Sequence, residues 1–354
     1  MRNKQRSLRL LLALLAVFAL VAAACGDDDD TDAGDETTTT ADGEAPSSDI
    51  RVGMVYDIGG RGDQSFNDAA AAGLDLAATE LGVEVRDLEP TAGGENREEL
   101  LRLLAEEGYD LVIGVGFAFE DAIVVAASEF PDTTFAIVDA APEADNIKGL
   151  VFAEDQGSFL VGVAAALKSE TGQIGFIGGV EIPLIQKFEA GYVAGAQAVN
   201  PDIEIDISYI TQAPDFSGFN DPARGKEIAA SMYQGGADVV YHAAGGSGGG
   251  LFEAASEAGE PGEVWAIGVD SDQYLTVGAP LNEYILTSML KRVDVAVFET
   301  IKAFTEGDAA GGVSVFDLSV DGVGYATSGG FVDDIADQLD DYKARVVAGE
   351  FTFE

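Results

Sequence analysis

The chain has 354 residues, of which 63 are acidic and 19 are basic, giving a formal net charge of −44 at pH 7. This charge repels phosphates over the whole surface, so it argues against a nucleic acid partner and against electrostatic adhesion to anionic lipid. A hydrophobic content of 47% is enough for two domains with ordinary cores, and the single cysteine excludes a disulfide within one chain.

The first 24 residues have the three parts of an export signal. Four basic residues lie between Arg2 and Arg9, Leu10–Ala24 is an unbroken run of 15 apolar residues, and small residues lead into Cys25. The run is too short to cross a bilayer comfortably. It resembles a bacterial lipoprotein signal, so we expect residues 1–24 to be removed and Cys25 to be the lipidation site. The alternative is an ordinary cleaved signal with an incidental cysteine.

The segment after the cysteine has the composition of a solvated linker. Residues 26–49 contain no basic and no aromatic residue, an acidic run at Asp27–Asp30 and a threonine run at Thr37–Thr40. Such a segment has too little apolar matter to fold. We therefore expect residues 25–49 to be an acidic, disordered tether.

From Ile50 onward, short apolar runs alternate with amphipathic stretches. Ser65, followed by Asp68, is expected to cap the first helix. The alternation predicts a parallel sheet with helices on both faces. We expect strands at 51–56, 83–86, 111–115 and 134–138, and helices at 65–81, 96–107 and 120–130.

The same rhythm returns in the second half of the chain. Two similar halves predict an α/β protein of two lobes, each a mostly parallel sheet flanked by helices, with hinge crossovers between the lobes. We expect the first lobe at 50–150 with a return at about 271–305, and the second at 151–270 with a C-terminal segment at about 306–354. The predicted helices are 156–168, 184–199, 222–234, 250–258 and 291–305, and the strands are 173–177, 203–209, 238–241, 264–269, 285–289 and one near 315–318.

Acidic, amide, glycine and phenylalanine residues recur directly after the predicted strands. Asp57, Asp139 and Asp270 each follow a different strand. In such sheets ligands bind at the carboxyl ends of the strands. Carboxylates accept hydrogen bonds from neighbouring hydroxyls, and aromatic faces pack on a flat ring. The pattern predicts a site for a small, flat molecule that carries hydroxyl groups.

Several of these segments, in the same order along the chain, resemble the basic membrane protein family, also called PnrA-like, of ABC transporter substrate-binding lipoproteins. The resemblance covers residues 50–354, and its first and fifth motifs are the most specific. The motifs are Asp57–Asn67, Phe135–Asp139, Gly218–Asp221, His242–Gly248, Ile267–Gln273 and Thr287–Arg292.

The resemblance implies a type I periplasmic-binding fold that closes on a nucleoside, mostly a purine one. It implies that Phe66 and Phe219 stack on the two faces of the base, although Phe216 lies in the same loop. Further expected contacts are hydrogen bonds from Asp57, Asn67 and Asp139, backbone groups of Gly246, and Asp270 and Lys291 on the ribose.

We therefore expect a monomeric, lipid-anchored protein on the extracytoplasmic face of the membrane, which delivers a nucleoside to ABC permease subunits and is not an enzyme. The alternatives are a binding protein for a free sugar or other small solute, and a surface sensor. An enzyme is less favoured, because the lone His242 has no cysteine nucleophile available once Cys25 is lipidated, and Gly245–Gly250 lacks the lysine of a phosphate loop. No cofactor is expected, and a single histidine argues against a metal site.

Overall fold

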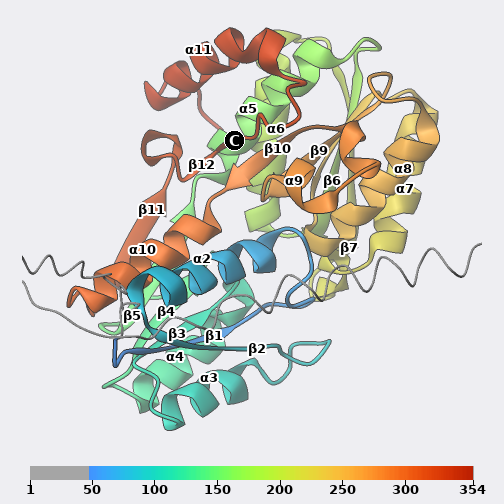
Figure 1. Cartoon of the computed structure of the whole chain (residues 1–354). Helices are drawn as coiled ribbons and strands as arrows, with labels where there is room; N and C mark the ends of the chain where they lie inside the picture. Colours follow the sequence, from blue (N-terminus) through green and yellow to red (C-terminus); the bar gives the residue numbers. More distant parts are fainter. Residues whose placement is uncertain (1–47, 354) are drawn as a thin grey trace, which may run out of the picture. The chain divides into compact units, whose positions relative to one another are not determined.

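The computed structural model describes residues 48–353. The predicted signal peptide, Cys25 and nearly all of the predicted tether lie outside the described residues. Within them, the chain builds two six-stranded sheets, each with helices on both faces (Figure 1). The predicted α/β architecture of two parallel-sheet lobes is confirmed.

The first sheet has the strand order β11-β5-β4-β3-β1-β2, and all of its pairs are parallel. Its central strands are continuous apolar runs, buried on both sides, which suits a sheet covered by helices on both faces. Helices α3 and α4 pack on one face, and α2 and α10 pack on the other (Figure 1). The elements are β1 Arg51–Val55, α2 Phe66–Leu81, β2 Glu84–Leu88, α3 Arg97–Glu106, β3 Leu111–Gly114, η1 Phe117–Phe119, α4 Glu120–Glu129, β4 Thr134–Val138, β5 Ile147–Phe152, α10 Val293–Thr305 and β11 Gly312–Phe316.

The second sheet has the order β12-β10-β9-β8-β6-β7, with only the β10–β12 pair antiparallel. Helices α5 and α6 pack against each other, as do α7 and α8. The elements are α5 Glu154–Lys168, β6 Gln173–Glu181, α6 Pro183–Val199, β7 Glu204–Gln212, η2 Phe216–Phe219, α7 Pro222–Gly235, β8 Val239–Ala243, η3 Gly245–Gly248, α8 Gly249–Ala258, β9 Trp265–Asp270, α9 Gln273–Val277, η4 Leu281–Tyr284, β10 Ile285–Lys291, η5 Leu318–Val320, β12 Val323–Tyr325, η6 Asp333–Ile335 and α11 Ala336–Val347.

The chain crosses between the lobes three times, at 152–154, 291–293 and 316–323. This differs from the predicted boundaries. Residues 271–291 belong to the second lobe, because β10 pairs with β9 there, and the return to the first lobe consists of α10 and β11 at 293–316. The helix α10 lies so close to α2 that a Cβ atom on Gly73 would sit 2.4 Å from the carbonyl oxygen of Asp294.

Candidate functional site

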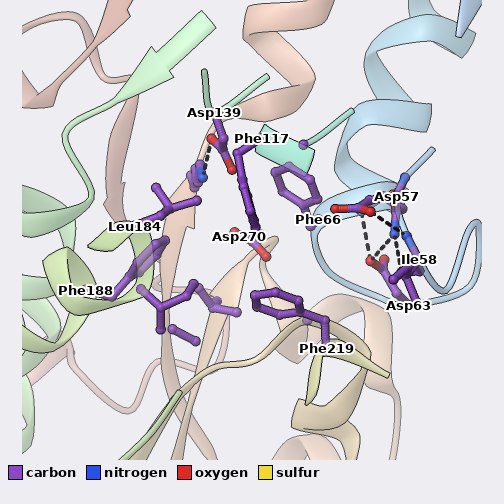
Figure 2. A pocket seen from close by; sticks show the side chains of 17 residues that line it. Asp57, Ile58, Asp63, Phe66, Phe117, Asp139, Leu184, Phe188, Phe219 and Asp270 are labelled. Carbon is purple, nitrogen blue, oxygen red and sulfur yellow. Dashed lines mark hydrogen bonds and ion pairs between the residues drawn. The ribbon is translucent and has the colours of Figure 1, made fainter. Parts of the chain in front are cut away.

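A cavity of about 580 Å³, including its open mouth, lies at the carboxyl ends of strands from both sheets. Its wall combines acidic side chains with aromatic and aliphatic ones (Figure 2). The lining residues are Asp57, Ile58, Asp63, Phe66, Asn67, Gly116, Phe117, Asp139, Leu184, Ile185, Phe188, Phe219, Ala243, Gly245, Val269, Asp270 and Lys291.

The loop between β1 and α2 is held by its own polar side chains. Asp63 accepts hydrogen bonds from the backbone N–H groups of Ser65, Asn67 and Asp68, and so caps α2. The carboxamide of Asn67 accepts from the N–H of Asp57 at 2.9 Å and donates to Asp63 at 3.1 Å. The predicted cap, Ser65, makes no capping bond. Asn67 therefore lines the cavity, but its carboxamide is already engaged in shaping the loop.

Asp139 and Asp270 lie at the ends of β4 and β9 with φ values of 69° and 65°. This left-handed conformation is uncommon for residues other than glycine, and aspartate tolerates it better than most. Asp270 accepts a hydrogen bond from the Ser65 hydroxyl at 2.5 Å. Burial raises the pKa of Asp270 to about 7, against the opposing effects of Lys291 and of the Ser65 bond.

Lys291, the last residue of β10, is the buried cation of the site, with a side chain only 2% exposed. Its Nζ lies 2.6 Å from Asp139 Oδ1 and 3.3 Å from Glu154 Oε1. Burial by itself would lower the pKa of Lys291, but the carboxylates of Asp139, Glu154 and Asp270 outweigh it and raise that pKa above its ordinary value. The lysine is therefore charged, and it compensates part of the negative charge of the wall.

Three carboxylates of the wall share one arrangement. One oxygen of each is engaged within the protein: Asp57 Oδ1 by Arg97 and the N–H of Ile58, Asp139 Oδ1 by Lys291, and Asp270 Oδ2 by Ser65. The second oxygen of each receives no hydrogen bond from residues 48–353, and all three residues line the cavity. The site therefore offers hydrogen-bond acceptors to a ligand that brings donors.

Aromatic rings complete the wall. Phe66, at the start of α2, and Phe219, at the end of η2, lie on either side of open space in Figure 2. Phe117 also lines the cavity and meets Phe216 edge-on, with ring centroids 5.7 Å apart. Phe216 itself is absent from the lining, so Phe219 is the ring of this loop that faces the cavity.

Seven of the eight predicted ligand-binding residues line this cavity: Asp57, Phe66, Asn67, Asp139, Phe219, Asp270 and Lys291. Gly246 does not, and its neighbour Gly245 takes that place at the start of η3. The prediction missed the apolar lining from α6, whose residues Leu184, Ile185 and Phe188 look like ordinary core positions in the sequence. It also missed Arg97, which pairs with Asp57, and Glu154, which pairs with Lys291. Neither Arg97 nor Glu154 lines the cavity itself.

Hydrogen bonds join the two lobes at the mouth of the site. Gln273 donates to the carbonyl of Gln64 at 3.0 Å, Gln64 donates to the carbonyl of Thr276 at 3.2 Å, and the hydroxyl of Ser271 donates to the carbonyl of Ser65 at 3.1 Å. Together with the Ser65–Asp270 bond, they hold the α2 entry loop against the end of β9. The structure therefore has the lobes in contact around the cavity.

The single histidine has a structural environment. His242 is fully buried in β8, and its Nε2 lies 2.9 Å from Oε1 of Gln273. Burial lowers the pKa of His242 to about 4. Between residues 48 and 353, no three His, Cys, Asp or Glu side chains form a group that could hold a metal ion. No helix in this stretch is long and apolar enough to cross a membrane.

Comparisons with known proteins identify the fold and the family. The model of a family described as ABC transporter substrate-binding protein PnrA-like matches residues 50–352. The CD4+ T-cell-stimulating antigen of Listeria innocua is 36% identical over 98% of both chains. The ABC transporter nucleoside-binding protein BmpA of Lactococcus lactis is 34% identical over 86% of this chain and 89% of its own.

Among solved structures, a solute-binding protein of an ABC transporter system from Aeropyrum pernix has a TM-score of 0.75 and 32% identity, over 86% of this chain and 93% of its own. The match to the family model spans both lobes and every residue of the cavity wall. The chain therefore belongs to the PnrA-like family of ABC transporter substrate-binding proteins.

Proposed function

We propose that this substrate-binding protein captures a nucleoside, most favourably a purine one, and delivers it to the permease subunits of an ABC importer. The observation that carries the proposal is the combination of three wall carboxylates, each with one oxygen lacking a protein donor, and two phenylalanine rings on either side of open space. A nucleoside matches both, because its ribose brings hydroxyl donors and its base brings a flat ring.

The two ends of the cavity bind different parts of the nucleoside in this proposal. Phe66 and Phe219 stack on the base, while Asp139, Asp270 and Lys291 bind the ribose. Stacking on an aromatic ring contributes about 1–3 kcal/mol for each base, and a hydrogen bond to a charged group contributes about 1.5–3 kcal/mol. The name of the Lactococcus lactis relative is consistent with this assignment.

A thermal-shift panel tests the proposal. The purified protein is heated with inosine, guanosine, adenosine, their free bases, ribose, galactose and the nucleoside 5′-monophosphates. Nucleosides should raise the melting temperature. The monophosphates should raise it much less, because the wall carboxylates repel a phosphate. A shift with ribose or galactose alone would replace the proposal with a sugar-binding function.

We also propose that residues 1–24 are removed on export and that Cys25 carries the lipid anchor. The basic start, the short apolar run and the position of the only cysteine support it. Replacing Cys25 with alanine should release the protein from the membrane fraction into the medium. Retention of the variant in the membrane fraction would contradict the proposed anchor.

A further inference from the structure

Arg97 lies directly behind one of the wall carboxylates. It is the first residue of α3, and its Nη2 donates to Asp57 Oδ1 at 2.7 Å. The two side chains are only 12% and 15% exposed, so solvent screens the pair weakly. Arg97 Nη1 also donates to the carbonyl of Gly94 at 3.2 Å, and the guanidinium lies 5.5 Å from the centre of the Phe119 ring. These contacts fix the guanidinium in one place.

The pair leaves one oxygen of Asp57 available to a ligand. Oδ1 accepts from Arg97 and, at 2.8 Å, from the N–H of Ile58. Oδ2 receives no donor from the part of the chain that the structure describes. This oxygen lies beside Gly116: a Cβ atom on that residue would be only 2.6 Å from Oδ2. Asp57 therefore presents Oδ2 to the cavity as an acceptor of fixed position.

The position of Asp57 assigns it to one end of a bound nucleoside. In Figure 2, Asp57 lies beyond the Phe66 and Phe219 rings, on the side away from Asp139 and from the ion pair that Asp139 makes. With the ribose at Asp139 and Asp270, a base between the two rings directs its outer edge towards Asp57. This step rests on the proposed nucleoside function.

We propose that Arg97 determines which purine the protein prefers, by keeping Asp57 an acceptor and so favouring 6-oxopurine nucleosides, such as inosine and guanosine, over adenosine. The ring nitrogen N1 of a 6-oxopurine carries a proton and donates to a carboxylate. The same nitrogen of adenine is an acceptor, so a carboxylate facing it leaves two acceptors unpaired. A site that loses a buried hydrogen bond in this way rejects the mismatched ligand.

The ionisation of Asp57 is what the arginine controls. Burial raises the pKa of Asp57 above its ordinary value, Arg97 opposes that rise without cancelling it, and the charge of Asp139 adds to it. Without Arg97, Asp57 would take up a proton more readily. A protonated carboxyl can donate to N1 of adenine, so the preference between the two purines would fall or reverse.

The test compares affinities for inosine and adenosine by isothermal titration calorimetry between pH 5.5 and 8.5. The wild-type protein should bind inosine about tenfold or more tightly than adenosine at pH 8.5. Arg97→Met should bring the ratio close to one and make it fall at low pH. Arg97→Lys should largely restore the ratio. Arg102→Met, in the same helix but paired with the more exposed Glu98 and Glu129, is the matched control and should leave the ratio unchanged.

Asp57→Asn keeps the test decisive if Arg97→Met does not fold. An asparagine at this position has an amide group that can donate to N1 of adenine. The affinity for adenosine should therefore rise relative to the affinity for inosine. A protein that binds no purine nucleoside would overturn the proposed function itself. Equal affinities in the wild type, or a ratio that both Arg97→Met and Asp57→Asn leave unchanged, would overturn only the role of Arg97.

Discussion

Nucleoside binding should strengthen as the pH rises through 7, and Asp270 is the reason. This carboxylate is buried, and burial raises its pKa to about 7, so a proton competes with the ligand there near neutral pH. A ribose hydroxyl that donates to its second oxygen favours the ionised form and lowers the pKa in the complex. Binding at low pH therefore first requires the loss of a proton.

The magnitude follows from that pKa. If the pKa falls well below 6 in the complex, affinity should be about tenfold weaker at pH 6 than at pH 8, which is about 1.4 kcal/mol. Most of the gain should occur between pH 6 and pH 7.5, and the affinity should level off above pH 8. Lys291, Asp63 and Asp139 are the charged groups that affect Asp270, and among them the lysine stays protonated throughout this range.

Isothermal titration calorimetry with inosine at pH 6, 7 and 8 measures the effect. Asp270→Asn removes the titrating group, so this variant should bind more weakly and with little change over the same range. Equal affinity of the wild type at pH 6 and pH 8, or tighter binding at pH 6, would refute the reasoning. A slope that persists in Asp270→Asn would assign the titration to another carboxylate.

Two further predictions concern single side chains. Phe66→Ala should weaken nucleoside binding about 5- to 150-fold, corresponding to the loss of about 1–3 kcal/mol of stacking, with the folded state retained; unchanged affinity by calorimetry would remove Phe66 from the site. Lys291→Met should lower the free energy of unfolding in urea by about 3–5 kcal/mol, because it leaves Asp139 as a buried charge without its partner and leaves Glu154 with Lys187 alone, at 3.7 Å. Lys226→Met, which breaks an exposed pair with Glu253 and Glu257, is its control; an equal loss in both variants would contradict the argument.

The wall carboxylates could be predicted from sequence because they depend on a local rule. In a parallel sheet, the residue after each strand lies at the carboxyl edge, so Asp57, Asp139 and Asp270 converge once the strands are recognised. The roles given to Phe66, Phe219 and Lys291 came from the family resemblance. Gly246 does not line the cavity, whereas its neighbour Gly245 does, so a backbone contact of Gly246 with the ligand stays a prediction.

The groups behind the wall could not be found in the same way. Arg97 and Glu154 begin helices, where charged residues are usually solvated, and only the packing of α3 and α5 brings them to Asp57 and Lys291. The lobe boundaries failed for a related reason. Strand β10 has the composition of any buried strand, and nothing local says that its neighbour is β9 of the second sheet. Strand β5, which lies between β4 and β11, and the acidic helix α11 were also not predicted.

The three crossings between the lobes also constrain how the protein can be made. The first sheet is completed by β11, which lies after residue 311, and the second by β12, which lies after residue 322. Neither half can be produced as one uninterrupted gene fragment. A nascent chain emerging from its amino end cannot complete the first sheet before β11, or the second before β12, has been synthesised.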